Sequence, residues 1–322
     1  MSSVSQFMER NYKHFNAREM LAAAKAWRSL VAEGGEMFLA MAGAMSTAEI
    51  GISLAEMIRQ EKVHAVCCTA ANLEEDLFNL FANREYRMVP DYRALTAEDE
   101  VRLRDNGYNR VTDTCIPFSV MQNTDDTLVE MWSRAAEAGT SRFWWEYFYE
   151  LFDRPEVPDL FQIPPENSWV LAAKQRNLPI YTPGVEDSTL GASYCAAVMR
   201  GQVSNHHAVK TGTQQLEHLT HWYLERAKRK TPVGFFQIGG GIAGDFSICT
   251  VPMIIEDLKT DVPFWAYFAQ ISDSTTSYGS YSGAVPNEKI TWHKLDVNTP
   301  RFMINSDASI VAPLIFSYVL GQ

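Results

Sequence analysis

The chain alternates short strand-like runs with helical patterns over most of its length, and this alternation restricts the folds open to it. Six runs have the length and apolar character of buried strands: 37–41, 65–68, 179–182, 233–238, 264–271 and 301–305. Helical patterns separate them, including an alanine-rich segment that ends near Gly34 and a long segment over 207–230. Strands joined through helices form mostly parallel sheets with helices on both faces. The sequence therefore predicts an α/β fold built on a parallel sheet.

Local signals predict where several helices begin. Asn16 followed by Glu19, and Ser46 followed by Glu49, have the spacing of a capping box. The acidic run 74–76 is typical of a first helical turn, where the helix dipole stabilises negative charge. These signals predict helices that open near residues 16, 46 and 74.

The composition excludes several classes of protein. Hydrophobic residues make up 46% of the chain and charged residues 21%, which excludes a disordered or fibrous protein. With 28 Lys and Arg against 39 Asp and Glu, the net charge of −11 argues against nonspecific nucleic-acid binding, which needs clustered basic residues. No uninterrupted apolar stretch reaches the roughly 20 helical residues that span a bilayer. We therefore expect neither a nucleic-acid partner nor a membrane span.

The cysteines and the N-terminal residues indicate a compartment. The five cysteines form no C-x-x-C pair, and Cys67 and Cys68 lie inside an apolar run, where small buried side chains are expected. An odd number of cysteines without a disulfide framework fits a reducing environment. The opening residues are polar and of mixed charge, so we expect no signal peptide and a cytoplasmic protein. We expect no metal site.

No internal repeat, low-complexity tract or linker divides the chain. We therefore expect one domain over residues 1–322, with residues 1–36 as an N-terminal helical extension. The aromatic segment 143–148 is expected to pack in the core, because buried aromatic side chains contribute much of a core's apolar area.

The run 239–244 has the pattern G-x-G-x-x-G and lies between a predicted strand and a predicted helix. In that context glycines let the backbone approach a pyrophosphate, and the helix N-terminus offers free N–H groups to an anion. The acidic residues 256, 257 and 261 fall slightly short of the spacing expected for a ribose-binding acid. The motif alone is therefore as compatible with an ordinary strand-to-helix turn as with a dinucleotide site.

A second loop, 277–284, is rich in glycine and serine and precedes a segment that ends in Lys294. One interpretation is a surface loop followed by an edge strand with an exposed lysine, which is the usual state of lysine. The other is that Lys294, beside the Trp292 indole, is a partly desolvated amine. Burial favours the neutral amine, which can attack a carbonyl or imine and form a Schiff base. Spacing alone favours the exposed lysine.

Several segments in this order resemble motifs of the deoxyhypusine synthase family: 69–76, 239–241, 282–294 and 306–309. The resemblance extends from about residue 37 to the C-terminus, and 15–18 resembles the bacterial-type branch. The S-G-A segment with its downstream W-x-K and D-A-S is the specific part. The resemblance implies an NAD-dependent homotetramer with a Rossmann-like sheet and active sites at subunit interfaces.

The resemblance also implies a chemistry. In the family, NAD oxidises a polyamine such as spermidine to an imine, and a lysine captures the aminobutyl group as an enzyme-bound imine. An acceptor amine displaces that lysine, and the product is then reduced. Lys294 corresponds to the lysine, and Trp292 and Glu288 correspond to residues that line the polyamine channel.

A larger set of residues corresponds to cofactor-contacting positions of the family. These residues are Ser46, Thr69, Ala70, Glu74, Glu75, Asp187, Gly239, Gly240, Gly241, Ser280, Ser282, Asp307 and Ala308. Some of these residues also have an alternative interpretation as ordinary structural residues. Glu74 and Glu75 can stabilise a helix dipole, and Asp307 can cap a helix N-terminus.

Other positions depart from the eukaryotic-type enzymes. Asp245 replaces a histidine, and Cys249 replaces an asparagine. Tyr281 and Ala192 replace aspartates, and His293 replaces the glycine before the lysine. Most of these positions contact polyamine in the family, so we expect Asp245 and Tyr281 in a changed substrate site. His293 either tunes the proton affinity of the neighbouring lysine or fills space.

Together these features favour an aminobutyl or guanidinobutyl transferase. The changed recognition residues favour a small amine acceptor such as putrescine or agmatine and a homospermidine-like product. The alternative is deoxyhypusine synthesis on a lysine of a translation factor. A third hypothesis is a non-catalytic NAD-binding relative, against which the retained Lys294 argues.

Overall fold

The computed structural model describes residues 3–277 and 279–322, with only the backbone described at 123 and 125. Six parallel strands form the main sheet in the order β6-β2-β1-β7-β8-β9. These strands are β1 (Glu36–Met41), β2 (Ala65–Cys68), β6 (Ile180–Tyr181), β7 (Val233–Ile238), β8 (Tyr267–Ser272) and β9 (Arg301–Asn305). All six predicted strands are present, and the predicted α/β fold with a parallel sheet is confirmed.

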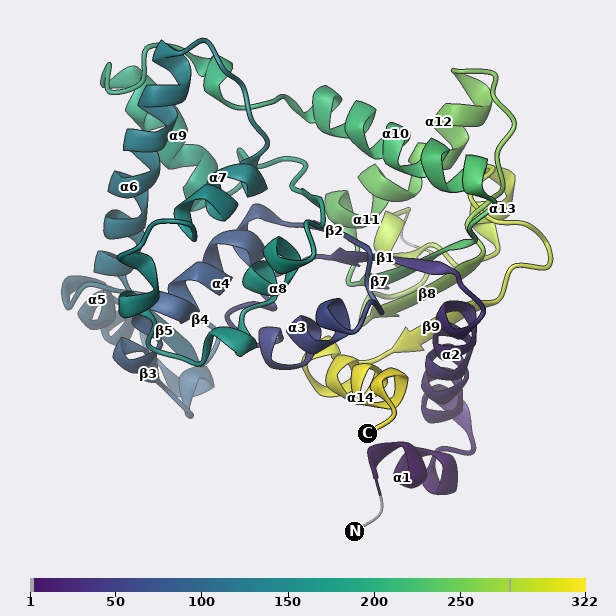
Figure 1. The fold of residues 1–322 in the computed structure, drawn as a ribbon. Helices are drawn as coiled ribbons and strands as arrows, with labels where there is room; N and C mark the ends of the chain where they lie inside the picture. The colour runs from purple at the N-terminus through teal and green to yellow at the C-terminus, as the bar shows by residue number, and fades with distance from the viewer. Residues whose placement is uncertain (1–2, 278) are drawn as a thin grey trace.

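Helices connect the strands and cover both faces of the sheet. In Figure 1, α10, α11 and α12 lie above the sheet, whereas α2, α3 and α14 lie below it. The α-helices are α1 (Val4–Asn11), α2 (Phe15–Ala32), α3 (Gly51–Arg59), α4 (Ala70–Ala82), α5 (Ala97–Asp105), α6 (Phe118–Glu137), α7 (Trp144–Leu151), α8 (Trp169–Gln175), α9 (Thr189–Met199), α10 (Gly212–Arg229), α11 (Gly241–Ile248), α12 (Thr250–Glu256), α13 (Glu288–Thr291) and α14 (Ala308–Leu320). None of the described helices is long and apolar enough to cross a membrane.

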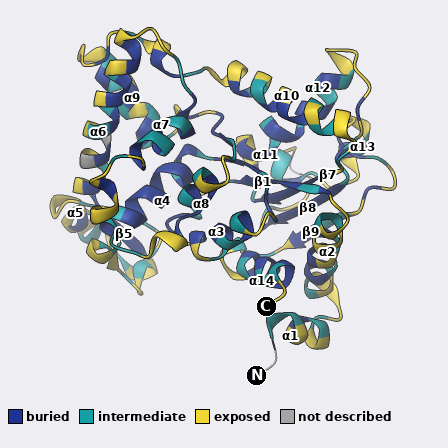
Figure 2. Ribbon diagram, viewed as in Figure 1, coloured by how far each residue is buried: buried dark blue, intermediate teal, exposed yellow. Residues whose placement is uncertain are grey.

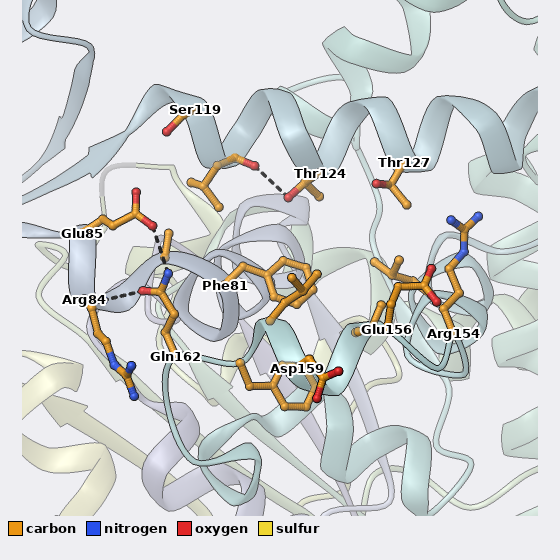
Figure 3. A pocket seen from close by; sticks show the side chains of 16 residues that line it. Phe81, Arg84, Glu85, Ser119, Thr124, Thr127, Arg154, Glu156, Asp159 and Gln162 are labelled. Atoms are coloured by element: carbon orange, nitrogen blue, oxygen red, sulfur yellow. Dashed lines mark hydrogen bonds between the residues drawn. The ribbon is translucent and has the colours of Figure 1, made fainter.

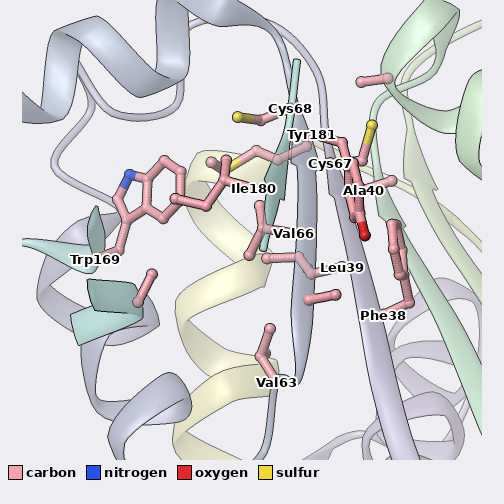
Figure 4. Packing of buried hydrophobic residues seen from close by; sticks show 14 of the residues in the cluster. Phe38, Leu39, Ala40, Val63, Val66, Cys67, Cys68, Trp169, Ile180 and Tyr181 are labelled. Atoms are coloured by element: carbon pink, nitrogen blue, oxygen red, sulfur yellow. The ribbon is translucent and has the colours of Figure 1, made fainter. Parts of the chain in front are cut away.

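The centre of the core lies around β1, which has a strand on either side and helices on both faces. The Phe38 ring stacks on that of Phe235 with centroids 5.6 Å apart, and the Trp265 indole meets it edge-on at 5.8 Å. Figure 4 shows Phe38 with Cys67 and Cys68 of the neighbouring strand, and Figure 2 shows the buried sheet between more exposed helices. Both cysteines are fully buried free thiols, as predicted.

The aromatic segment packs in the core, which confirms that prediction. Trp144 and Trp145 in α7 are buried. Trp144 meets Trp132 edge-on at 5.9 Å, and Trp145 meets Tyr181 of β6 at 5.6 Å. The segment therefore attaches the helices around α6 to the edge of the main sheet.

A second, antiparallel sheet was not predicted. Its strands are β3 (Arg87–Met88), β4 (Tyr108–Val111) and β5 (Thr114–Pro117), in the order β3-β5-β4. Only β5 is buried along its whole length, while β3 is exposed. Strands this short, with polar residues such as Arg87 and Asn109, lack the continuous apolar run that identifies the strands of the main sheet.

One of the three predicted helix starts is confirmed and two are wrong. Helix α2 begins at Phe15, beside the predicted position, although Asn16 is not its cap. Asn16 lies inside α2, and its side-chain amide donates to the backbone carbonyl of Asn305 instead of capping the helix. Ser46 lies five residues before α3 begins. The cap of α4 is Thr69, so the acidic run 74–76 falls beyond the first turn. Ser46 and Glu74 are instead bound by distant parts of the chain, while the local residue Thr69 caps α4.

Two further segments differ from expectation. The long helix α10 begins at Gly212 rather than 207, because Thr211 and Gln214 form its capping box. The segment that precedes Lys294 forms the short helix α13 rather than an edge strand. The interpretation of Lys294 as an exposed lysine on an edge strand is therefore wrong.

Candidate active site

The strand order places a crevice at one edge of the main sheet. Numbered along the chain, the six strands run 3-2-1-4-5-6 across the sheet, which is the order of a doubly wound dinucleotide-binding fold. The order reverses between β1 and β7, where the connections from their carboxyl ends depart to opposite faces. In such sheets, ligands bind outside the carboxyl ends of the strands at this point.

The triple glycine follows β7 at this edge and opens α11. Gly239 and Gly241 adopt positive φ angles of 74° and 64°, a region that favours glycine. At Gly240 a Cβ atom would lie 1.8 Å from Ser282 Oγ. The glycines are therefore required both by backbone conformation and by the close approach of the 277–284 loop. Tyr278 of that loop lies outside the described residues.

A buried asparagine, which the sequence analysis missed, holds the loop that follows β1. The Asn72 amide group donates to the carbonyl of Gly43 at 2.8 Å and to Thr69 Oγ1 at 2.7 Å. Ser46 donates its hydroxyl to the Asn72 carbonyl at 2.6 Å and accepts from the Trp169 indole N–H at 2.9 Å. Ser46 is fully buried, so protein groups already occupy the hydroxyl that was expected to contact the cofactor.

The acids of α4 are buried against neighbouring backbone. Glu74 accepts a 2.7 Å hydrogen bond from the Leu190 amide, and Glu75 accepts a 3.3 Å bond from the Thr47 amide. Burial raises the pKa of Glu75 to about 7, although the bonds from Thr47 act in the opposite direction. Because these acids also lie beyond the first turn of α4, their interpretation as helix-dipole partners is wrong.

The third acid of the run, Asp76, joins α4 to the start of α8. Its carboxylate accepts hydrogen bonds from the Ser168 hydroxyl and from the amides of Trp169 and Val170. Burial nevertheless raises its pKa to about 7. Asp76 thus satisfies the free N–H groups at the start of α8.

Lys294 is buried at the far side of the crevice. It is 6% exposed, and its Nζ lies 3.0 Å from Asp245 Oδ1 of α11. Nζ also lies 5.4 Å from the ring centroid of Tyr281 and 5.9 Å from that of Trp292. Trp292 itself is 67% exposed.

The Lys294 amine faces a pocket of about 500 Å³ that contains all the predicted substrate residues. The pocket is lined by Asp245, Cys249, Ser277, Gly279, Ser280, Tyr281, Ala284, Glu288, Trp292 and Lys294. A second pocket, of about 580 Å³, shares Asp245, Cys249 and Tyr281 with the first and extends to Gly241. The glycine turn and the lysine therefore open onto one continuous region of the crevice.

The remaining predicted cofactor residues lie at other points of the same sheet edge. Ala70 is the buried first residue of α4. Asp187 is exposed in the loop between β6 and α9 and does not line the lysine pocket. Asp307 caps α14 by accepting from the Ser309 amide at 2.7 Å, as its N-cap interpretation predicted, and Ala308 begins that helix.

Two buried glutamines under the glycine turn were also missed. Gln237 and Gln270 each donate to the carbonyl of Gly239, at 2.8 and 3.1 Å. Gln237 accepts from the Tyr281 hydroxyl at 2.7 Å, and Gln270 donates to the carbonyl of Ser282 at 3.0 Å. These side chains tie the glycine turn to the 277–284 loop. Polar residues inside otherwise apolar strands are the signal that could have identified them.

A family model described as deoxyhypusine synthase matches residues 6–319. The chain belongs to the deoxyhypusine synthase family. Membership indicates a transferase.

The similarity to individual members of the deoxyhypusine synthase family is distant but extends along the chain. A deoxyhypusine synthase-like protein of Cyanothece sp. is 29% identical over 88% of this chain and 70% of its own length. A protein named probable deoxyhypusine synthase 2 of Archaeoglobus fulgidus is 26% identical over 95% of this chain and 94% of its own. The crystal structure of a candidate deoxyhypusine synthase from Entamoeba histolytica covers 99% of this chain and 94% of its own, with 11% identity and a TM-score of 0.60, and supports the fold.

The structure shows where one departure from the deoxyhypusine synthase family pattern lies. His293 adopts a φ of 54°, in the left-handed region that favours glycine, the residue expected there. Its Nδ1 lies 2.6 Å from Glu256 Oε1 of α12, and His293 does not line the lysine pocket. The imidazole therefore contacts the outside of the segment rather than the Lys294 amine.

Another cavity, of about 520 Å³, lies away from the crevice between α6 and the short helix 157–160. Figure 3 shows Phe81 at its centre and Gln162, which accepts from the Arg84 amide and donates to Glu85. None of the predicted site residues lines it. Its mixture of arginines and acids indicates no single class of ligand.

Proposed function

We propose that this member of the deoxyhypusine synthase family transfers a 4-aminobutyl or guanidinobutyl group from a polyamine to a small amine. The transfer passes through an imine on Lys294. The observation that carries the proposal is a buried lysine, 3.0 Å from a carboxylate, facing a pocket beside the glycine turn. An exposed surface lysine has neither the partner nor the pocket.

The residues at the crevice between β1 and β7, where the strand order reverses, fit NAD. At Gly240 any side chain would collide with Ser282, whereas Gly241 is open and exposed at the start of α11. This leaves backbone N–H groups available to a pyrophosphate. We propose that Thr69, Glu74, Glu75, Asp187 and the loop serines hold the rest of the cofactor. Bound NAD would supply the hydride acceptor and donor of the reaction.

Lys294 and Asp245 are placed for proton and group transfer. Asp245 accepts the proton of the Lys294 ammonium across the 3.0 Å contact. The neutral amine then adds to the imine carbon of the oxidised donor, and the departing amine of the donor takes a proton as its C–N bond breaks. Attack by the acceptor amine on the Lys294 imine reverses this exchange and returns Lys294 as an amine.

The pocket charges support a cationic substrate. Glu288 lines the pocket, and no cationic side chain among the described residues forms an ion pair with it, while Asp245 is occupied by Lys294. Glu288 is therefore available to a substrate ammonium, and the Trp292 ring is available to its aminobutyl chain. Tyr281 lies where an aspartate is expected in the eukaryotic-type enzymes, so the protein has one fewer carboxylate for a long substrate. This supports a small acceptor and a homospermidine-like product.

The exposed apolar side chains at the crevice support a subunit interface. Trp292, Ile242 and Ile310 are each more than half exposed, at the carboxyl edge of the sheet. Burying such side chains against a second subunit is favourable. We propose a homotetramer in which these residues are covered.

Borohydride trapping tests the proposal. The protein is incubated with NAD and spermidine, putrescine or agmatine, reduced, digested and examined by mass spectrometry. We expect a butylamine adduct on Lys294, and released homospermidine-like product in unreduced samples. Lys294→Ala should abolish adduct and product, whereas Lys259→Ala, at an exposed lysine, should change neither. An active Lys294→Ala variant contradicts the mechanism.

Further incubations distinguish the possible acceptors. Product formed from small amines alone supports the proposal. Labelled aminobutyl carbon that appears only on a lysine of an added translation factor favours deoxyhypusine synthesis instead. NAD binding without any adduct identifies a non-catalytic relative.

A further inference from the structure

One buried side chain contacts both the glycine turn and the wall of the Lys294 pocket. Gln237, in β7, is fully buried. Its Nε2 donates to the Gly239 carbonyl at 2.8 Å, and its Oε1 accepts from the Tyr281 hydroxyl at 2.7 Å. A flipped amide would place two oxygen acceptors, those of Gln237 and Gly239, against each other. The two bonds therefore fix the orientation of this side chain.

The last glycine of the G-x-G-x-x-G run leaves room for this amide. At Gly244, in α11, a Cβ atom would lie 2.6 Å from Gln237 Oε1 and 2.9 Å from its Nε2, closer than such contacts allow. Helix α11 therefore packs directly on the amide and restricts its rotation. A second glutamine, Gln270, donates to the same Gly239 carbonyl at 3.1 Å. The glycine turn consequently keeps one of its two bonds when Gln237 is lost.

The Tyr281 ring lies in the wall of both pockets of the crevice. It lines the pocket of Lys294 and the pocket that extends to Gly241. Lys294 Nζ lies 5.4 Å from the ring centroid, and Nζ of the buried Lys289 lies 4.9 Å from it. Because Gln237 accepts the hydrogen of the Tyr281 hydroxyl, the aromatic ring is the part of this side chain that is left to a ligand.

Loss of Gln237 would leave the Tyr281 hydroxyl without its acceptor. A buried donor that loses its acceptor carries the desolvation cost of the group. Asp245 lines both pockets together with Tyr281, and its carboxylate pairs with Lys294 at 3.0 Å. A hydroxyl that turned toward this carboxylate would enter the space of the substrate and compete with Lys294 for Asp245.

We propose that Gln237 is a positioning residue for both ligands of the crevice. Through the Gly239 carbonyl it holds the turn that would receive the pyrophosphate of NAD. Through the Tyr281 hydroxyl it keeps an aromatic ring, rather than a hydrogen-bond donor, beside a cationic polyamine chain. The inference rests on the proposed function for the identity of the two ligands.

Calorimetric titration measures both effects without turnover. The full-length protein is titrated with NADH, and then with spermidine at saturating NADH, because the reduced cofactor cannot accept a hydride. Gln237→Leu removes both hydrogen bonds with little change in side-chain size. It should weaken spermidine binding by about tenfold, the effect of an unsatisfied buried hydroxyl. NADH binding should weaken by only about threefold, because Gln270 keeps the second bond to the turn.

A double substitution separates positioning from a loss of packing. Gln237→Leu/Tyr281→Phe contains no unsatisfied hydroxyl, and removing a donor together with its acceptor costs little. Its spermidine affinity should therefore come within about twofold of that of Tyr281→Phe. Its NADH affinity should stay at the level of Gln237→Leu, since the bond to Gly239 is still missing. Thermal melting should find the double variant more stable than Gln237→Leu.

Gln215→Leu is the matched control. Gln215 is a buried glutamine whose Oε1 accepts from the Thr182 amide at 2.7 Å, and it lines neither pocket of the crevice. This variant also loses a buried hydrogen bond, so it should melt at a lower temperature than the wild type. It should bind spermidine and NADH as the wild type does.

The outcomes are distinct. Equal spermidine affinity in wild type and Gln237→Leu overturns the proposal, as does a double variant that binds spermidine no better than Gln237→Leu. A wild type that binds neither ligand overturns it too. The predicted binding pattern without a polyamine adduct on borohydride treatment retains this inference and rejects the proposed function. An adduct on Lys294 without the binding pattern does the reverse.

Discussion

Replacing Glu75 by glutamine should remove a large part of the protein's loss of stability between pH 5 and pH 8. Glu75 is buried and accepts a hydrogen bond from the Thr47 amide, which a glutamine oxygen could also accept. Its pKa is raised from an ordinary 4.5 to about 7 in the folded protein. The folded state therefore holds a proton that the unfolded chain has released, and stability falls as pH rises through this window.

The magnitude follows from the pKa difference. One unit of difference between the folded and unfolded pKa values corresponds to about 1.4 kcal/mol. Glu75 therefore lowers the free energy of unfolding by about 3 kcal/mol once it is ionised in both the folded and the unfolded state. Most of this, about 2.5 kcal/mol, is lost between pH 5 and pH 8. Asp76, whose pKa is also raised to about 7, keeps its own pH dependence in the variant. The slope should therefore shrink rather than vanish.

Urea unfolding at pH 5 and pH 8, followed by tryptophan fluorescence, provides the measurement. Glu75→Gln should reduce the difference between the two free energies by about 2.5 kcal/mol relative to the wild type. Glu98→Gln, at an exposed position in the first turn of α5, should leave the difference unchanged. An unaltered pH dependence in Glu75→Gln would refute the reasoning that desolvation dominates at this carboxyl.

Two other substitutions test the crevice. Gly240→Ala places a Cβ atom 1.8 Å from Ser282 Oγ and should weaken NAD binding by more than about tenfold in calorimetric titration. Unchanged affinity would mean that this turn does not bind the cofactor. His293→Gly removes a residue with φ of 54° whose imidazole contacts Glu256 and not the Lys294 amine. The rate at which trace acetic anhydride acetylates Lys294, followed by mass spectrometry, should therefore stay within about twofold of the wild-type rate. A larger change would mean that His293 tunes the amine after all.

The buried acids and the buried lysines share one physical property. Glu75, Asp76 and Lys289 are ionisable groups whose charged forms are opposed by burial. Such groups are costly to keep, and they cluster at functional sites. Lys289 lies against Tyr281, which lines the Lys294 pocket, and this supports the location that the strand order indicates. Asp76 instead binds the N–H groups at the start of α8.

The amino-acid sequence by itself determined the main sheet. Its strands are buried on both faces, so each is a nearly continuous apolar run that local inspection can find, and the glycine turn and Lys294 follow from motifs of fixed spacing. The same reasoning failed where the decisive contact joins distant residues. The acidic run of α4 has the spacing of a first turn, yet Thr69 caps the helix and the acids meet Thr47, Ser168 and Leu190.

Tertiary structure alone decided which polar groups are buried. Lys289 and Lys294 are both lysines in one short segment, and no local pattern separates them. Lys289 is buried against the rings of Phe268 and Tyr281. Lys294 faces a pocket and pairs with Asp245, which lies 49 residues away in the sequence. Desolvation depends on the atoms that surround a group in space, and those atoms come from strands and loops far apart in the chain.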